Sequence, residues 1–451
     1  MKLNFKNRKF FQELTILIVL FCIVFLFSIY SRPSLIPKWS PDGYGYLSVS
    51  QDFSSDFSNI RPFFFPLIIK ICHFISFNNW QIYFSLLQMT LHSLMVLILF
   101  KNFQEFNLST MSSFFCSIII GFNPSLLYYS TYILADFTLA ILTTLCWIFL
   151  LRLDFNKKDV LIYAILASVF SGLCIVTKPI SLIMIVPIII TIYFLNGISN
   201  KIIKISVIMI LINFSFHYFW NEYKDHSTSN ANKRQLDIMW GGFNMTAIRG
   251  GLIDLGEGTK LYKAIEKEGF LDKAKDLKIK FSYTMDTNPD YLDVYYALGE
   301  YTGWDRVKLL NDKEFAMQVI RKAPFSLFFY SISNWHSFFT KRSFNPSFPT
   351  MPKFFKKIYD TIYAVLYRPL LLILLITSFI YMFVNKNLSP LYISLSIILY
   401  SSLILAIMTP HGGEFPRYRV WVEYIMWFCA LVPFGLALDR IYSNYFKMKK
   451  I

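Results

Sequence analysis

The chain contains ten long apolar runs, and these constrain its fold more than any other feature. A run of about 20 mostly apolar residues is long enough to cross the hydrocarbon core of a bilayer as a helix. The runs lie at 11–30, 79–100, 111–131, 135–152, 160–178, 180–198, 204–220, 360–384, 388–408 and 418–438. Composition agrees, because 55% of the residues are hydrophobic and only 16% are charged. We therefore expect a polytopic α-helical membrane protein with about ten transmembrane helices and not a soluble enzyme.

The positions of Lys and Arg predict how these helices are oriented. The formal net charge is +16, which in a soluble protein would suggest nucleic-acid binding. If the N-terminus is cytoplasmic, however, the inner loops hold most of the basic residues, as the positive-inside rule requires. The inner basic residues are Lys101, Arg152, Lys157, Lys158, Lys201, Lys204, Lys386, Arg440, Lys447, Lys449 and Lys450. We expect both termini to be cytoplasmic, the bilayer to be the main partner, and no nucleic acid to be bound.

This topology divides the chain into three parts. Residues 1–220 form an N-terminal transmembrane module of about seven helices, whose first outer loop is 31–78. Residues 221–359 hold more than half of the acidic residues and form an extracytoplasmic soluble domain, mixed or mainly helical. Residues 360–451 are the C-terminal transmembrane helices. Within the first loop, the apolar stretch 63–77 is too short to span and is expected to lie along the membrane surface.

Two carboxylates near the predicted outer face are the main candidates for chemistry. Asp42 lies in the sequence SPDGYGY at 40–46, which is typical of a tight turn. A carboxylate there could also accept a proton from a hydroxyl group or bind a cation. Asp136 lies at the start of the apolar run 135–152, which almost no loop separates from the run before it. It either caps a helix or serves a function, because an acid so close to hydrocarbon is costly. The predicted topology places Asp42 and Asp136 on the same face.

Basic residues on the predicted outer side indicate a specific role, because the positive-inside rule disfavours them there. Lys178 lies at the end of the fifth predicted helix, and Arg417 and Arg419 lie at the start of the last one. Their side chains either extend to lipid headgroups or bind an anionic ligand, and guanidinium groups bind phosphate through paired hydrogen bonds.

Some further outer residues are candidates for contacts with substrate. His411 and Glu414 lie in the short outer segment before Arg417, where they could instead form a salt-bridged network with the arginines. The candidate substrate contacts are Tyr44, Arg61, His411 and Glu414.

Several short motifs occur in a characteristic order. An Asp follows the first helix and a second acid lies at the next outer turn. The sequence GLCIVTKP at 172–179 stands in place of a GLxxxTRP pattern, and RYRVWVE at 417–423 stands in place of RYRxPxxP. Residues 317–327 look like an IxxxPxxyl helix that returns to the membrane. In this layout the chain resembles the GT-C fold glycosyltransferases, and more narrowly the bacterial branch related to protein O-mannosyltransferases and the lipid A aminoarabinose transferase.

The resemblance implies a role for each matching residue. Asp42 matches a catalytic acid that is implied to act as general base. Asp136 matches a second acid, implied to support the base or to help hold a divalent metal cation. Lys178, Arg417 and Arg419 match positions implied to bind the phosphate of a polyprenyl-phosphate donor. The chain departs from the pattern in having Lys for Arg, Trp for Pro and one Asp in place of an acidic pair, so metal dependence stays open.

We therefore predict an inverting glycosyltransferase that uses a polyprenyl-phosphate-linked sugar. Its acceptor would be a lipid, a glycan or a protein at the outer face of the bacterial cytoplasmic membrane. A lipid-linked donor needs no nucleotide pocket, and the sequence has no Gly-rich phosphate loop. Two alternatives remain: a lipid-linked polysaccharide polymerase or ligase, and a transporter or flippase, for which the sequence shows no inverted repeat.

Overall fold

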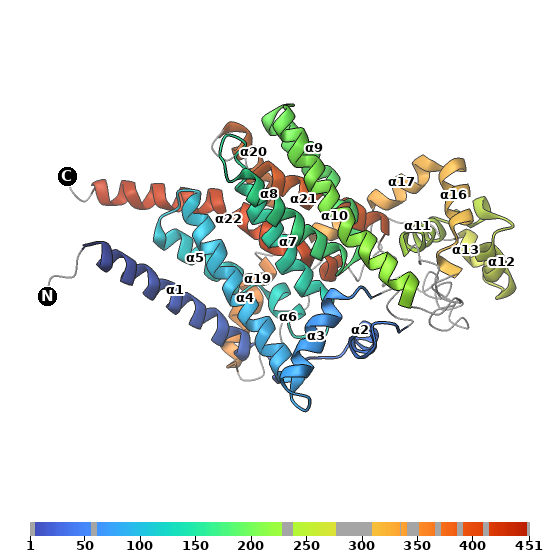
Figure 1. Ribbon diagram of the computed structural model, residues 1–451, viewed down its shortest axis with the longest axis horizontal. Helices are drawn as coiled ribbons and strands as arrows, with labels where there is room; N and C mark the ends of the chain where they lie inside the picture. Colours follow the sequence, from blue (N-terminus) through green and yellow to red (C-terminus); the bar gives the residue numbers. More distant parts are fainter. Residues whose placement is uncertain are drawn as a thin grey trace.

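The structure is a computed structural model that describes residues 5–55, 61–227, 238–276, 309–333, 335–340, 351–365, 371–385, 391–408 and 415–448. Within these ranges the regular structure is helical, apart from an isolated β-bridge between Lys38 and Tyr132. Each of the ten predicted apolar ranges coincides with helix in the part of the chain that is described (Figure 1). The prediction of a helical protein is confirmed.

Four helices are long and apolar enough, by length and composition, to cross a membrane. They belong to α1 (Phe5–Tyr30), α4 (Trp80–Glu105), α10 (Asn200–Ser227) and α22 (Phe415–Met448). Seven more apolar helices have 10–17 residues each: α3 (Phe64–Ile75), α5 (Thr110–Gly121), α7 (Ala135–Leu151), α8 (Val160–Ile175), α9 (Ile185–Asn196), α20 (Leu371–Val384) and α21 (Tyr392–Met408). The fold is that of a helical membrane protein, and the number of ten spans stays a prediction.

Local sequence explains why one predicted span is interrupted. The range 111–131 forms α5 and then α6 (Pro124–Tyr129). The side chain of Asn123 accepts a hydrogen bond from the Leu126 N–H at 3.1 Å and so caps α6. Pro124 occupies the first turn, where its missing N–H costs nothing. A capping residue followed by Pro therefore starts a new helix inside an apolar run.

Helices α7 and α22 form the centre of the bundle. Residues 419–432 of α22 are all buried, and α7 is buried along almost its whole length. A helix that is apolar on every side belongs in the interior, and these two pack against each other, with α8 packed against α7 and α5 against α22. The beginning of α1 and the end of α22 lie at one end of the bundle (Figure 1). The first turn of α22 lies at the other end.

The first loop adds two short helices at that second end. Helix α2 (Pro41–Gln51) packs against α3, and both meet the start of α4 around a small core that contains Tyr46, Phe65 and Phe84. Helix α3 is the stretch predicted to lie along the membrane surface, and Phe74 near its end is 93% exposed.

A second unit, with a core of its own, comes from the predicted soluble domain. It contains α11 (Ile238–Arg249), η3 (Ile253–Gly256), α12 (Lys260–Lys267), α13 (Leu271–Asp276) and α16 (Lys313–Lys322). After it, α17 (Pro324–Ser333) and α18 (Trp335–Thr340) return to pack against α21. The amphipathic α19 (Lys353–Val365) then lies beside α5, because the Tyr359 hydroxyl donates to the Phe122 carbonyl at 2.8 Å.

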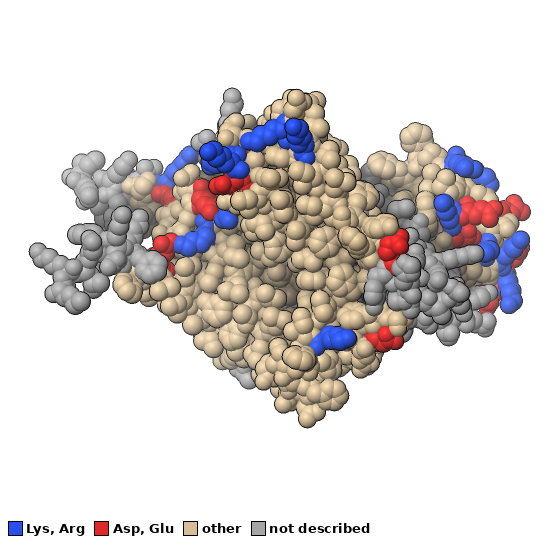
Figure 2. Space-filling model, in the orientation of Figure 1, with Lys and Arg blue, Asp and Glu red and all other residues tan. Residues whose placement is uncertain are grey.

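Charge is distributed unevenly over the surface. Figure 2 shows the described Lys, Arg, Asp and Glu side chains of one face along its upper left edge, at its right end and near its lower right, with a wide uncharged area over the helical bundle between them. Many large apolar side chains in this bundle are exposed, including Leu26, Phe194 and Leu211. Apolar surface of this extent is what a lipid-facing bundle presents.

Candidate active site

The first candidate carboxylate, Asp42, begins a helix and not a turn. The Ser40 hydroxyl caps α2 by accepting from the Gly43 N–H at 3.1 Å, and Pro41 occupies the first helical turn. Gly43 is helical and does not have the positive φ that favours glycine in tight turns, so the interpretation of residues 40–46 as a turn is wrong. Gly43 matters because of space: a Cβ there would come within 3.1 Å of the Ile133 carbonyl oxygen. The start of α2 can therefore lie directly against the turn that leads into α7.

The second candidate, Asp136, lies in the first turn of α7 and is completely buried. It does not cap its helix, because the N-cap is Leu134 and no side chain bonds the first N–H groups there. Its oxygens instead accept hydrogen bonds from Lys178 Nζ at 2.5 Å, Arg417 Nε at 2.9 Å and Trp421 Nε1 at 2.9 Å. The helix-cap interpretation of Asp136 is therefore wrong, and the carboxylate belongs to a contact between elements far apart in the chain.

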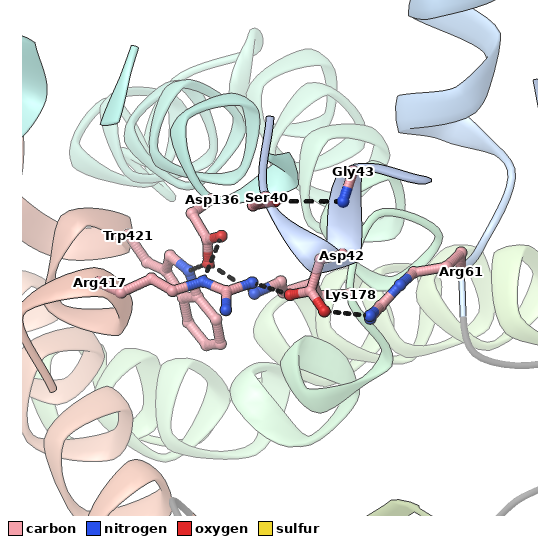
Figure 3. Close-up of polar contacts among 8 residues, drawn as sticks. All are labelled: Ser40, Asp42, Gly43, Arg61, Asp136, Lys178, Arg417 and Trp421. Atoms are coloured by element: carbon pink, nitrogen blue, oxygen red, sulfur yellow. Dashed lines mark hydrogen bonds and ion pairs between the residues drawn. The ribbon is translucent and has the colours of Figure 1, made fainter. Parts of the chain in front are cut away.

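Arg417 joins the two carboxylates. Its Nε donates to Asp136 and its Nη2 donates to Asp42 Oδ2, while Arg61 Nη2 donates to Asp42 Oδ1 at 2.5 Å. Figure 3 shows Asp42 between the two guanidinium groups, with Lys178 and Asp136 beside them. The sequence-predicted residues Asp42, Asp136, Lys178, Arg417 and Arg61 thus form one cluster, which we call the ion cluster.

Among the described residues, the ion cluster carries more positive than negative charge. Three cations, Arg61, Lys178 and Arg417, meet two carboxylates there, Asp42 and Asp136. The excess of one positive charge favours a negatively charged ligand.

Aromatic rings contact all three cations, and the Arg417 guanidinium lies 5.5 Å from the ring centre of Tyr418. Lys178 Nζ lies 4.8 Å from the ring centre of Tyr418 and 4.9 Å from that of Trp421. The Arg61 guanidinium lies 5.0 Å from the ring centre of the buried Tyr46. Such contacts stabilise a cation and leave its N–H groups able to donate to other partners.

Electrostatics keep Asp42 ionised. Burial alone raises the pKa of its carboxyl group, but the charges of Arg61 and Arg417 outweigh burial and hold the pKa below its ordinary value. A carboxylate with both oxygens bound to guanidinium groups is a weak proton acceptor. Asp42 can act as a base only after at least one of these guanidinium groups turns to another anion.

Arg419 faces away from the ion cluster. It is completely buried, and its Nε donates to Glu423 Oε1 at 2.8 Å while its Nη1 donates to the Phe338 carbonyl at 2.9 Å. Residues two apart on a helix point about 200° away from each other. Arg417 therefore shares a face with Trp421, and Arg419 shares the opposite one with Glu423. The expectation that both arginines of the 417–419 motif face the same ligand does not fit this geometry.

The remaining predicted contacts are spread more widely. Tyr44 is 64% exposed and stacks on Trp39, with ring centres 5.1 Å apart. His411 and Glu414 lie outside the described residues.

Sequence reasoning assigned no role to Trp421 or Tyr46, which contact the ion cluster directly. Trp421 could have been found from its spacing, since it lies one helical turn after Arg417. Tyr46 has the same spacing after Asp42, but residues 40–46 were interpreted as a turn, so helical spacing was not applied to them.

The ion cluster does not fit a divalent metal cation. Both carboxylates are already paired with cationic side chains, and a metal would add charge to a site that is net positive. In the part of the chain that the structure describes, no group of three or more His, Cys, Asp or Glu side chains could hold a metal ion.

Comparisons with known proteins find little similarity. No family model and no curated protein matches the chain. Among solved structures it is similar to the archaeal oligosaccharyltransferase AglB from Archaeoglobus fulgidus, in complex with an inhibitory peptide and a dolichol-phosphate. The match has 14% sequence identity and a TM-score of 0.49, and it covers 98% of this chain and 52% of AglB, so the chain spans about half the length of that protein. At this level of similarity, function has to be argued from the ion cluster itself.

Proposed function

We propose that the protein is a membrane glycosyltransferase that moves a sugar from a polyprenyl-phosphate donor to an acceptor hydroxyl group. One observation carries the proposal: Asp42 and Asp136 share a net-positive cluster with Arg61, Lys178 and Arg417 at one end of a lipid-facing helical bundle. Such a cluster combines a potential base with preplaced counter-charges for phosphate.

The location of the cluster suits a lipid-linked donor. Asp136 begins α7, Lys178 follows α8 and Arg417 begins α22, so three helices of the bundle contribute side chains at the same end. A polyprenyl chain lying along these helices would bring its phosphate to the height of Lys178 and Arg417. Guanidinium and ammonium groups donate strong hydrogen bonds to phosphate oxygens.

Donor binding would also activate the base. The donor phosphate competes with Asp42 for Arg417, because a guanidinium group can turn its Nη2 from a carboxylate to a phosphate oxygen. Asp42 Oδ2 then becomes free to accept a proton, while Asp136 keeps hold of Lys178, Trp421 and the Arg417 Nε. In this scheme Asp42 is active only when the donor is present.

The proposed reaction is a single displacement. The acceptor hydroxyl oxygen forms a bond to the anomeric carbon, and its proton goes to Asp42. The bond between the anomeric carbon and the phosphate oxygen breaks, and the polyprenyl phosphate leaves with the bonding electron pair. Negative charge develops on that phosphate, where Arg417 and Lys178 stabilise it, and one displacement inverts the anomeric carbon. No step passes through a metal ion.

The topology is part of the proposal. With ten spans and both termini in the cytoplasm, the ion cluster and the α11–α16 unit would lie on the outer face of a bacterial cytoplasmic membrane. The acceptor, whether lipid, glycan or protein, would then approach from outside and contact this unit.

A transfer assay in proteoliposomes tests the function. Wild-type protein is expected to move radiolabel from a polyprenyl-phosphate sugar to an acceptor fraction, and Asp42→Asn is expected to lower the rate at least about 100-fold, the usual contribution of a general base. The matched control is Asp154→Asn, since Asp154 is partly exposed and pairs with Lys157 away from the cluster. Full turnover by Asp42→Asn contradicts the assigned base. Movement of the lipid or sugar across the bilayer without covalent transfer favours the transporter alternative.

A further inference from the structure

A buried arginine outside the ion cluster has no negative partner among the described residues. Arg32 follows the end of α1 by two residues, and its side chain is 5% exposed. Its Nη2 donates to the Ser130 hydroxyl at 2.9 Å. Its Nε and Nη1 are buried without a hydrogen-bond partner, and no described carboxylate pairs with it. Burial lowers the pKa of Arg32 to about 10, so the guanidinium group stays charged at neutral pH.

A buried charge of this kind calls for a counter-ion. A guanidinium group that leaves water loses hydration, and a single neutral hydroxyl replaces only part of it. The buried cations of the ion cluster satisfy this requirement, since Arg61, Lys178 and Arg417 each meet a carboxylate. Arg32 has two N–H-bearing nitrogens directed at no acceptor among the described residues.

A second cation, Lys38, lies against the same turn of the chain. The backbone of Lys38 is fixed to residues 131–133, because its N–H donates to the Thr131 carbonyl at 2.7 Å and its carbonyl accepts from the Ile133 N–H at 3.0 Å. Its Nζ lies 5.7 Å from the ring centre of Tyr128 and 5.6 Å from that of Tyr132. Arg32 and Lys38 are therefore both held against the turn 128–132, which includes Ser130.

The surroundings of Arg32 point to lipid. The apolar part of α1 is mostly unburied, and near its end Leu26 is 62% exposed, Ile29 36% and Tyr30 39%. Such a helix faces the acyl chains, so a residue just beyond its end lies at the height of the headgroups. Headgroup phosphates offer the negative charge and the acceptor oxygens that the guanidinium group of Arg32 requires.

We propose that Arg32, Ser130 and Lys38 form a binding site for the phosphate of a phospholipid headgroup, separate from the ion cluster. Arg32 would donate from Nε and Nη1 to two phosphate oxygens, with Ser130 orienting its Nη2. Lys38 would add a second positive charge at the edge of the site. The bound lipid would fix the end of α1 to the turn before α7.

Thermal denaturation of the purified, delipidated full-length protein tests this site. The probes are phosphatidylglycerol, a diacylglycerol with the same acyl chains but no phosphate, and inorganic phosphate. At about ten times its Kd, phosphatidylglycerol is expected to raise the Tm of wild type by about 1–2 °C, and diacylglycerol is expected to have no effect. Arg32→Met is expected to lose the phosphatidylglycerol effect, and its Tm without lipid should be equal to or above that of wild type, because an unpaired buried charge has been removed.

Two further variants complete the test. Arg32→Lys keeps the charge and should keep part of the shift. Arg152→Met, which removes an arginine that is paired with the exposed Glu105, should keep all of it. A full shift in Arg32→Met, no shift in wild type, or a large loss of stability in lipid-free Arg32→Met overturns the proposal. An equal shift with inorganic phosphate alone assigns the site to free phosphate and overturns the lipid assignment.

Discussion

Replacing Asp136 by Asn should destabilise the protein, because Lys178 and Arg417 lose the negative charge with which they pair. The buried carboxylate accepts charge-assisted hydrogen bonds from Lys178 and Arg417, whose side chains are only 13% and 17% exposed. Removing one partner of a buried ion pair costs about 3–5 kcal/mol, and the slight exposure of the cations favours the lower figure, about 3 kcal/mol. At an unfolding entropy of about 2 cal/mol/K per residue, this lowers the Tm of a 451-residue chain by about 3 °C.

Tryptophan fluorescence during thermal unfolding measures this change. Asp154→Asn, which removes a partly exposed carboxylate, is the matched control and should shift the Tm by less than about 1 °C. Adding Lys178→Met to Asp136→Asn should restore part of the loss, with a coupling of about 1–3 kcal/mol between the two positions. Equal shifts for Asp136→Asn and the control, or additive effects in the double variant, contradict the account of a buried ion cluster.

Three further predictions concern neighbouring residues. Trp421→Phe and Trp427→Phe each remove an indole donor to a buried carboxylate, and each should lower the free energy of unfolding by about 2 kcal/mol. Only Trp421→Phe should also slow sugar transfer. Equal transfer rates in the two variants contradict the role of Trp421. Arg419→Ala should lower the Tm, and at a temperature where this variant is folded its affinity for the donor should be unchanged. Arg417→Ala should weaken donor binding at least tenfold. The reverse order of the two variants in a donor-binding assay would contradict the assignment of Arg417 to the donor phosphate. Because the pKa of Asp42 lies below its ordinary value of about 3.9, its ion pairs stabilise the protein above about pH 4 and lose this effect as the pH falls through the lowered pKa. Tm measured from pH 6 to pH 3 should therefore fall more steeply in wild type than in Asp42→Asn, and parallel curves would contradict the lowered pKa.

The helices could be predicted from the sequence because the signal is local. An apolar run specifies a helix through its own residues. The break inside 111–131 was not predicted, although it has a local signal, because Asn123 caps a new helix that begins at Pro124. The sequence placed Asp42 and Asp136 on the same face, since helix direction alternates along the chain, but it did not predict a contact between them. In the structure the Arg417 side chain joins the two carboxylates.

The partners of each cation could not be predicted in the same way. Arg417 and Asp136 are 281 residues apart, and their contact depends on how α7 and α22 pack. Arg417 and Arg419 were expected to bind the same ligand because both were placed in the short outer segment at the start of the last predicted helix. The helix in fact begins at Phe415, so helical geometry separates Arg417 from Arg419. The sequence SPDG gave a similar ambiguity, because Ser, Pro and Asp favour a helix N-terminus as much as a turn.

A structure with bound polyprenyl phosphate tests the central claim most directly. The distances to measure join the phosphate oxygens to Arg417 and Lys178, and Arg417 Nη2 to Asp42 Oδ2. We expect the phosphate to accept hydrogen bonds from both cations and Asp42 Oδ2 to be released from Arg417. A phosphate bound elsewhere, with Arg417 still joining Asp42 to Asp136, would contradict the account.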